Sequence, residues 1–449
     1  MRKFLFAIAF LLSTTLTYGQ TYVTTYAGTG TAGFVNGDTA VAKFSSPFGM
    51  CKDKNGNIYV ADGGNNCIRK INTFTNTVST FAGNGVAGYA DGMDSLAQFN
   101  SPSDICVDDS GNVYVSDFLN HRIRKISYNG MVSTIAGNGI AGYSDGSSDS
   151  AEFNYPRGIC MDKTGNLYIG DSWNHRIRKI SPAGNVTTFA GSNADIGVSS
   201  VGDYVDASDT SARFYTPAGL AIDKDGNIYV ADAYNHRIRK IDTSRVVTTI
   251  AGSGNTGPGN GGYANGNTNV ALLNTPTEIY VDSTGKVYIS DTFNNRVRLL
   301  NSGVINTICG KGIAGFADGI DTSAKFNYPR GIVANSSGDK VYVVDYNNHA
   351  VRLIDVDVSG MDERDNSSSS INIYPNPNTG IFNITWGNKT ISPIVNCKIT
   401  DVLGKEVFHQ NFSFSTSHRL SLTNLADGIY VIIITSSDYR IVKKIIKHS

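Results

Sequence analysis

The 449-residue sequence has no long hydrophobic run, no excess of either charge, and only 11 prolines and six cysteines. A helix that spans a membrane needs roughly 18 consecutive apolar residues, and no segment contains them. Lysine and arginine number 38, as do aspartate and glutamate, whereas nucleic-acid binding depends on an excess of clustered cations. The sequence therefore predicts neither a transmembrane segment nor a nucleic-acid partner.

The motifs of common active sites are missing as well. The chain has no Gly-x-Ser-x-Gly elbow and no phosphate-binding loop with its lysine. Two segments, 53–57 and 223–227, begin like calcium loops but lack the later bidentate glutamate, so hairpin turns explain them better. We therefore predict no catalytic residue set, no metal site and no cofactor.

Residues 1–19 have the pattern of a secretory signal peptide. A charged start at Arg2 and Lys3 precedes an apolar run from Phe4 to Leu12, and small residues follow near a cleavage site. Removal of this segment leaves 36 basic side chains against 38 acidic ones, a net charge of about minus two. The mature protein is expected to leave the cytoplasm.

A repeat is the most informative feature that is present. The decapeptide from Asp117 to Ile126 returns almost unchanged, and looser copies occur elsewhere. The six copies begin at Asp62, Asp117, Asp171, Asp232, Asp291 and Asp345, which are 55, 54, 61, 59 and 54 residues apart. This period suits a four-stranded propeller blade with a long connection. Glycine, asparagine and aspartate separate the β-branched runs, as is typical of hairpins.

The two ends of the repeat are complementary. The fourth-strand pattern first occurs at 23–28, ahead of any first strand, whereas the sixth copy ends at Ile354 without one. We expect the N-terminal strand to complete the last blade and leave no open edge in the ring. The predicted fold is all-β, with a six-bladed β-propeller over residues 20–356 and a small β-sandwich after it.

The Asn-His-Arg-Ile-Arg-Lys-Ile segments, with Asp-x-x-Gly-Asn turns such as 162–166 and Ala-Gly-x-Gly loops, resemble NHL repeats. The resemblance covers residues 22 to about 354 and implies a six-bladed propeller. It says less about function, because NHL-type propellers include protein binders, RNA binders and a few enzymes.

The C-terminal part is a separate unit. Residues 357–370 are polar and form the predicted linker, and residues 371–449 start a second all-β pattern. The Tyr-Pro-Asn-Pro, Asp-x-Leu-Gly-Lys and Leu-x-x-Gly-Ile-Tyr motifs and the terminal lysines resemble the C-terminal sorting domain of the Bacteroidetes type IX secretion system. The resemblance implies export through the periplasm, recognition of 371–449 by the outer-membrane translocon, and a secreted or cell-surface protein.

Residues that recur in every blade serve what every blade needs, whereas a single site requires asymmetry. Four histidines share one repeat position, too far apart to hold one metal ion, so we expect structural hydrogen bonds. They are His121, His175, His236 and His349. The repeated arginines and aspartates are expected to form ion pairs within blades. Three cysteines at another shared position, Cys51, Cys106 and Cys160, are interpreted as small buried fillers.

The repeat is broken around blade 4. The end of a fourth strand lies 20 residues before the next blade's proline in four cases, but 27 residues separate Ala190 from Pro217 and 25 separate Ala251 from Pro276. Because alternate strands are antiparallel, both insertions open on the face that carries the turn between the second and third strands. One face thus gains an asymmetric rim.

Candidate binding residues lie on that face. Aromatic residues occupy the turns of blades 2 to 6, at Phe118, Trp173, Tyr234, Phe293 and Tyr346. Charged residues that differ from blade to blade are expected near the mouth of the channel, at Asp104, Arg157, Glu278 and Arg330. Aromatic rings suit stacking on a sugar or gripping a peptide. The alternative, that these rings only cap blade packing, stays open.

The leading hypothesis is a non-catalytic binding propeller, exported by the type IX pathway, whose ligand is an extracellular protein, peptide or glycan. The main alternative is an enzyme with a metal in the central channel, either a lactonase-like hydrolase or a lyase. For that role Asp104 and Glu278 are the only two suitably placed carboxylates, and no third ligand stands out. A purely structural surface protein is a third possibility.

Overall fold

The computed structural model describes residues 21–192, 203–335, 337–356, 371–374, 379–386, 394–401, 406–413, 417–435 and 440–447. The chain divides into two compact units, residues 1–361 and 362–449. The predicted signal peptide at 1–19 and linker at 357–370 lie outside the described residues.

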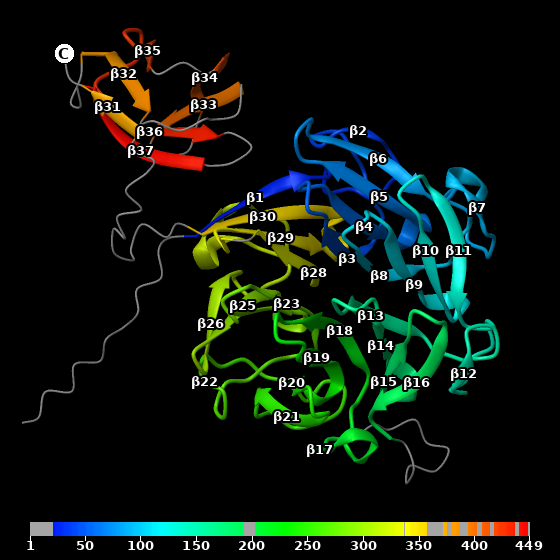
Figure 1. The fold of residues 1–449 in the computed structure, drawn as a ribbon. Coiled ribbons are helices and arrows are strands. Elements are labelled where there is room, and N and C mark those ends of the chain that lie inside the picture. The colour runs from blue at the N-terminus through cyan, green and yellow to red at the C-terminus, as the bar shows by residue number, and fades with distance from the viewer. Residues whose placement is uncertain are drawn as a thin grey trace, which may run out of the picture. The chain divides into compact units, whose positions relative to one another are not determined.

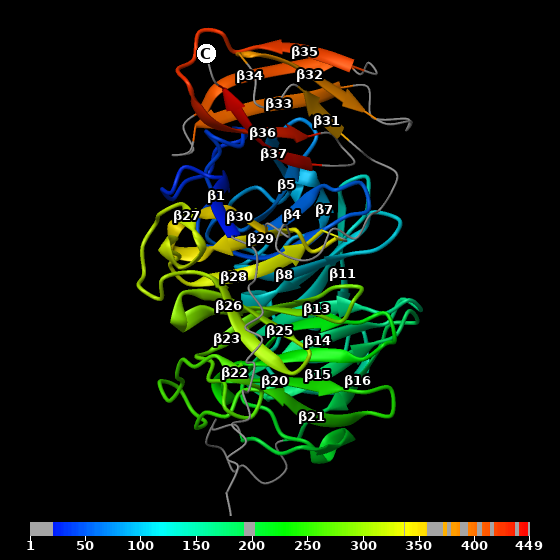
Figure 2. The same cartoon turned by 90° about the vertical axis from the view of Figure 1, so that its left-hand side faces the viewer.

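The first unit consists of six five-stranded sheets arranged radially around one axis (Figure 1). Figure 2 shows the same ring from the side. Blades 1 to 6 are numbered by their innermost strands, β3 (Pro47–Lys52), β8 (Pro102–Val107), β13 (Pro156–Met161), β18 (Pro217–Ile222), β23 (Pro276–Val281) and β28 (Pro329–Ala334). These strands surround the axis, and each lies against the innermost strands of both neighbouring blades.

The other long strands follow outward in each blade. The second strands are β4 (Ile58–Asp62), β9 (Val113–Asp117), β14 (Leu167–Asp171), β19 (Ile228–Asp232), β24 (Val287–Asp291) and β29 (Lys340–Asp345). The third strands are β5 (Cys67–Asn72), β10 (Arg122–Ile126), β15 (Arg176–Ile180), β20 (Arg237–Ile241), β25 (Arg296–Asn301) and β30 (Ala350–Val356). The fourth strands are β6 (Thr77–Ala82), β11 (Met131–Ala136), β16 (Asn185–Ala190), β21 (Val246–Ala251), β26 (Val304–Cys309) and, in blade 6, β1 (Thr21–Ala27).

A short fifth strand lies on the outer edge of every blade, where the sequence had predicted only four strands. These strands are β2 (Gly37–Asp38), β7 (Gly92–Met93), β12 (Gly146–Ser147), β17 (Ala207–Ser208), β22 (Gly266–Asn267) and β27 (Gly319–Ile320). Each comes from the loop that precedes its blade, as where Met93 pairs with Met131. The prediction was wrong because two residues leave no alternating pattern, yet they cover an otherwise open edge.

Short 3₁₀ turns lie in two of the connections between strands. Those between second and third strands are η1 (Gly63–Asn65), η3 (Phe118–Asn120), η4 (Ser172–Asn174), η6 (Ala233–Asn235), η7 (Thr292–Asn294) and η9 (Tyr346–Asn348). Three more, η2 (Asp94–Leu96), η5 (Asp209–Ser211) and η8 (Asp321–Ser323), precede innermost strands. Across the described residues, no helix is long and apolar enough to cross a membrane.

The ring closes in blade 6, where the two ends of the propeller share one sheet. β1 runs antiparallel to β30, with Val23 opposite Ile354, and its other edge pairs with β27. Alternating apolar residues bury one face of each sheet against the next blade, so the cores lie between blades. Tyr59 and Ala61 of blade 1, for example, join Ile105 and Val115 of blade 2 in one cluster. Burial of these apolar side chains between blades supplies the main stabilisation of the ring.

The second unit has two small sheets. One contains β31 (Ile371–Tyr374), β32 (Ile381–Trp386) and β35 (Ser417–Ser421) in that order. The other runs β34 (Glu406–Ser413), β33 (Ile394–Asp401), β36 (Gly428–Thr435) and β37 (Arg440–Lys447). Residues of both sheets, among them Phe382, Leu420, Ile399 and Ile432, share one buried core. This is the arrangement of a small β-sandwich.

Candidate functional site

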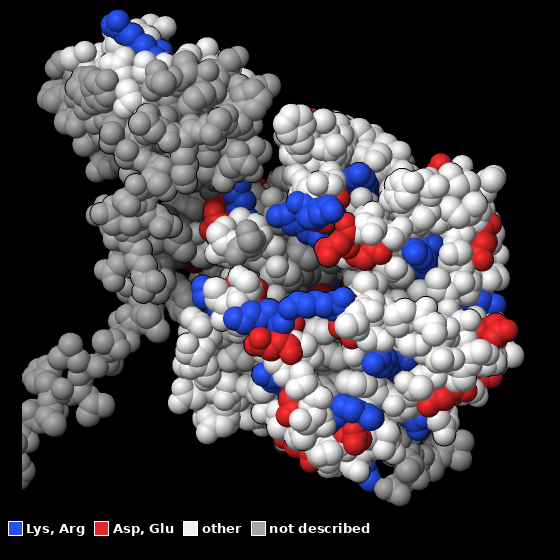
Figure 3. Space-filling view, viewed as in Figure 1, with Lys and Arg blue, Asp and Glu red and all other residues white. Residues whose placement is uncertain are grey.

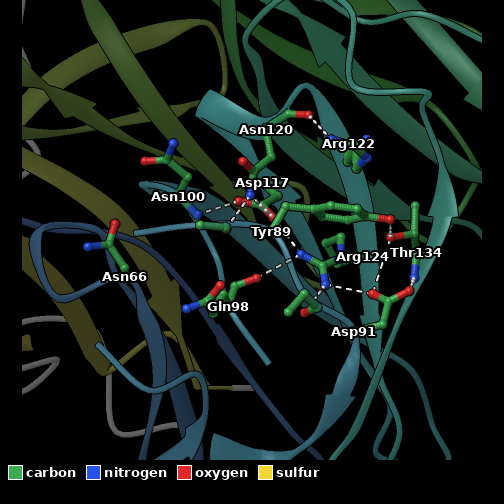
Figure 4. Close-up of polar contacts among 12 residues, drawn as sticks. Asn66, Tyr89, Asp91, Gln98, Asn100, Asp117, Asn120, Arg122, Arg124 and Thr134 are labelled. Carbon is green, nitrogen blue, oxygen red and sulfur yellow. Dashed lines mark hydrogen bonds and ion pairs between the residues drawn. The ribbon is translucent and has the colours of Figure 1, made fainter. Parts of the chain in front are cut away.

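Each blade fixes its turn with a buried carboxylate, as Figure 4 shows for blade 2. One oxygen of Asp117 accepts a hydrogen bond from the Asn100 backbone, and the other accepts from the Asn120 side chain and from Arg124 Nη1 at 2.7 Å. Arg124 also donates to the backbone carbonyl of Gln98 in the preceding loop. One charged pair thus ties the turn, the loop and the third strand together.

The predicted ion pairs occur in all six blades, with nitrogen–oxygen distances of 2.6 to 2.8 Å between fully buried side chains. The pairs are Arg69–Asp62, Arg124–Asp117, Arg178–Asp171, Arg239–Asp232, Arg298–Asp291 and Arg352–Asp345. Their recurrence in every blade assigns them to the scaffold.

The repeated histidines link each blade to the next one. His121 has φ 52°, in the left-handed region where Asn and His are enriched, and its Nδ1 accepts the Tyr155 backbone N–H at 3.2 Å. The six donor residues are Ser101, Tyr155, Thr216, Thr275, Tyr328 and Ser46, bonded to Asn66, His121, His175, His236, Asn295 and His349. The last bond crosses the closure of the ring. The structural interpretation of these histidines is confirmed.

These bonds require neutral imidazole, which gives a first prediction. Burial lowers the pKa of His121 and of His349, so their contribution to stability is present above the unfolded pKa and is lost as pH falls through the folded one. Because blades 1 and 5 use asparagine at this position, the double variant His121→Asn/His349→Asn should keep both bonds without titrating. We expect thermal unfolding to show a smaller loss of stability between pH 7 and pH 5 than in the unsubstituted protein, by about 1 kcal/mol per bond. Equal losses would contradict this role.

The turns carry an aromatic rim around the axis. Its members, the aromatic rim hereafter, are Phe48, Phe118, Tyr155, Trp173, Tyr215, Tyr234, Phe293, Tyr328 and Tyr346. The ring of Tyr155 lies between Phe118 and Trp173, with centroid distances of 4.9 and 5.1 Å. Trp173 nevertheless remains 52% exposed and Phe293 42%. The rim both packs neighbouring blades and presents ring surface to solvent.

Four of these rings were missed by the sequence analysis. Tyr155, Tyr215 and Tyr328 lie one or two residues before the proline that starts an innermost strand, and Phe48 lies just after it. Each contacts one of the predicted turn aromatics, as Phe293 does Tyr328 at 5.0 Å. The signal was available as an aromatic residue beside that proline in blades 1, 3, 4 and 6.

One of the two insertions folds onto blade 4. Gly257 donates its backbone N–H to the carbonyl of Tyr234 at 2.7 Å, and its own carbonyl accepts from His236 Nε2 at 2.8 Å. The longer insertion includes residues 193–202, which lie outside the described part of the chain. The described loop therefore makes blade 4 different from the others on this face.

The third residue of each innermost strand shows where charges meet the axis. It is glycine in four blades and acidic in two, in the order Gly49, Asp104, Gly158, Gly219, Glu278 and Gly331. Glycine is required because a β-carbon on Gly49 would lie 2.7 Å from Cα of Asp104, and one on Gly219 would lie 2.8 Å from Cα of Glu278. In the two acidic blades this residue instead lies opposite a serine of the second strand in the sheet register, Ser116 or Ser290. Blades 2 and 5 lie opposite each other.

The second residue of these strands repeats the same two-fold pattern. It is arginine in blades 3 and 6, which also face each other across the axis, at Arg157 and Arg330. The guanidinium of Arg330 lies 4.0 Å from the ring centre of Phe48 and 4.4 Å from that of Tyr346, and Arg157 lies 5.4 Å from Phe118. The structure thus places the four predicted charged residues on innermost strands around the axis, with both arginines against rings of the aromatic rim. We call Asp104, Glu278, Arg157 and Arg330 the axial cluster.

The members of the axial cluster affect one another. Burial raises the pKa of Asp104 to about 7, opposed by the backbone N–H groups of Ile159 and Ile105. Burial and the Asp104 charge raise the pKa of Glu278 well above its usual value. Burial, together with the charge of Arg157, lowers the pKa of Arg330. Groups from four blades therefore converge on one region.

The described residues contain no group of three or more histidine, cysteine, aspartate or glutamate side chains arranged to hold a metal ion. The channel-metal alternative thus finds no ligand set there. On the face seen in Figure 3, the basic and acidic side chains of the described residues are interspersed, without a large patch of one sign.

Six radial sheets in a closed ring define a six-bladed β-propeller, and its loops are asymmetric on one face. The NHL repeat model matches residues 44–71, 99–126, 153–180, 214–241 and 326–352, and the secretion system C-terminal sorting domain model matches 372–448. The chain is an NHL-repeat propeller protein with a type IX secretion sorting domain, and it is therefore exported to the cell surface or beyond. The repeat model does not match blade 5, although blade 5 also has the Arg298–Asp291 pair.

The chain spans less than half the length of the curated relatives that it matches. The chain is 31% identical over 285 residues to Protein SUPPRESSOR OF QUENCHING 1, chloroplastic, of Arabidopsis thaliana, covering 61% of this chain and 26% of that protein. It is 28% identical to human NHL repeat-containing protein 2, covering 58% of this chain and 39% of that protein. A solved auxiliary nutrient binding protein from Bacteroides thetaiotaomicron is similar with a TM-score of 0.56 at 16% identity, covering 75% of this chain and 76% of that one. This last likeness concerns the fold.

Proposed function

We propose that the propeller is an extracellular binding module whose ligand lies on the face with the aromatic rim, centred on Arg157 and Arg330. The observation that carries the proposal is the state of Arg330, whose buried Nη1 has no hydrogen-bond acceptor, whereas Nη1 of every blade arginine donates to an aspartate. Buried polar groups without partners are rare in folded proteins unless something else satisfies them.

The site also has the asymmetry that a specific ligand requires. The described insertion covers the turn of blade 4 only, and the axial cluster has two-fold rather than six-fold symmetry. Exposed rings at Trp173 and Phe293 offer flat apolar surface beside polar groups, the usual composition of a ligand site.

We further propose that residues 371–449 engage the secretion translocon and that the protein passes through the periplasm to the outer cell surface.

Glycan and peptide arrays test the binding role. We expect the double variant Trp173→Ala/Tyr234→Ala to lose about 10-fold or more in affinity for the ligand found, because two stacking surfaces are removed. Phe74→Ala, which removes a ring that is 78% exposed on a strand-connecting turn away from the rim, should bind unchanged. Unaltered binding by the double variant would place the site elsewhere.

A further inference from the structure

The axial arginines differ from the blade arginines in having no counter-ion. Neither Arg157 nor Arg330 forms an ion pair among the described residues, and Arg330 Nη1 is buried without an acceptor. The Nε atoms of both are also buried without an acceptor, as they are in five of the six blade arginines, so Nη1 is the atom that sets Arg330 apart. In Arg298 of blade 5, by contrast, Nη1 donates to Asp291 at 2.6 Å and Nη2 to the Asn265 side chain at 2.9 Å. A guanidinium stays charged at neutral pH, and a buried charge without a partner is costly.

The neighbouring acids Asp104 and Glu278 form no ion pair with either arginine among the described residues. Burial raises the pKa of Asp104 to about 7 and that of Glu278 well above its usual value, which disfavours the charged form of both carboxyl groups. Asp104 Oδ2 is also engaged by the Ile159 backbone N–H at 3.0 Å. Among the described residues, Arg157 and Arg330 are therefore left without a carboxylate partner.

We propose that the ligand is an acidic carbohydrate, with a uronate carboxylate held between Arg157 and Arg330 and its sugar rings stacked on the aromatic rim. This inference rests on the binding role proposed above. Guanidinium groups form their strongest hydrogen bonds with planar carboxylates, and such a carboxylate would supply both the missing counter-ion and the missing acceptors.

A carbohydrate fits this face better than a peptide that binds by strand addition. Peptides that bind by β-augmentation add a strand to a free sheet edge, but this face presents 3₁₀ turns, and the outer edge of each blade is taken by a two-residue strand. The exposed rings of Trp173 and Phe293 are instead suited to the apolar faces of pyranose rings.

The test is calorimetric titration of the full chain with trimers of galacturonate, glucuronate, mannuronate and guluronate, each beside its methyl ester. We expect at least one free acid to bind and its ester to bind about 10-fold or more weakly. Arg157→Gln and Arg330→Gln should each lower affinity about 10-fold, and the double variant about 100-fold. Arg245→Gln, which removes a partly exposed arginine paired with Asp209 in blade 4, should leave affinity unchanged.

Several results would overturn the inference. Equal binding of acid and ester, retained affinity in the double arginine variant, or failure of all four acids at millimolar concentration would each do so, as would binding of a peptide with a free terminal carboxylate instead. If neutral sugars bind and only Trp173→Ala/Tyr234→Ala abolishes binding, the binding face stands and the acidic ligand falls. If neither set of variants changes any binding found, both proposals fail.

Discussion

Replacing Arg124 with methionine is expected to lower the free energy of unfolding of the propeller by about 3–5 kcal/mol, because the substitution leaves a buried carboxylate without its partner. Arg124 donates to Asp117 at 2.7 Å, to Asp91 at 2.6 Å and to the carbonyls of Gln98 and Ala90. Methionine fills much of the space between Tyr89 and Phe99 but satisfies none of these acceptors. Urea unfolding followed by tryptophan fluorescence measures the change.

Arg122 provides the matched control two residues earlier on the same strand. It stacks on Tyr89 at 3.8 Å and donates to the carbonyls of Asn120 and Asn138, without a buried acid. Arg122→Met should cost about 1 kcal/mol. Adding Asp117→Asn to Arg124→Met should recover part of the stability, because the unpaired charge is then absent. A loss as large with Arg122→Met, or no recovery in the double variant, would mean that packing and not charge dominates.

The repeat made the architecture predictable because each copy reports the same physical unit. Six blades, ion pairs such as Arg124–Asp117 and histidine hydrogen bonds follow from positions that recur with one period. The fifth strand did not follow, since Gly92–Met93 is held by its pairing with β11 and not by a pattern of its own. Local sequence carries little information about an element that only a neighbour stabilises.

The candidate site could be predicted only in part. Counting blades was enough to place Asp104 and Glu278 on opposite sides of the ring, and the same count places Arg157 opposite Arg330. The partner rings could not be inferred from the turns, because Tyr155 reaches Phe118 across a blade boundary. The absence of an acceptor for Arg330 depends on every neighbour at once and becomes visible only in three dimensions.

Replacing Gly158, which lies beside the axial cluster, is expected to destabilise the ring itself. Gly158 of blade 3 faces the innermost strand of blade 4, where a β-carbon would collide with the Ala218 carbonyl oxygen and lie 2.8 Å from Gly219 Cα and from Leu220 N. Each of these is a backbone atom of a strand held in the closed ring, so no side chain can move aside. Gly158→Ala should therefore destabilise the propeller by about 3 kcal/mol or more.

Gly254 is the control, because its nearest neighbour would be Leu272 Cδ2 at 3.7 Å, an ordinary contact. Gly254→Ala should change the free energy of unfolding by less than about 0.5 kcal/mol. Gly158→Ala should also weaken ligand binding at temperatures where the protein stays folded, because Gly158 lies between Arg157 and Ile159, whose N–H holds Asp104. Urea unfolding and titration of the same sample separate the two effects. A stable Gly158→Ala protein would show that the innermost strands can move apart, and the axial cluster could not then be a fixed site.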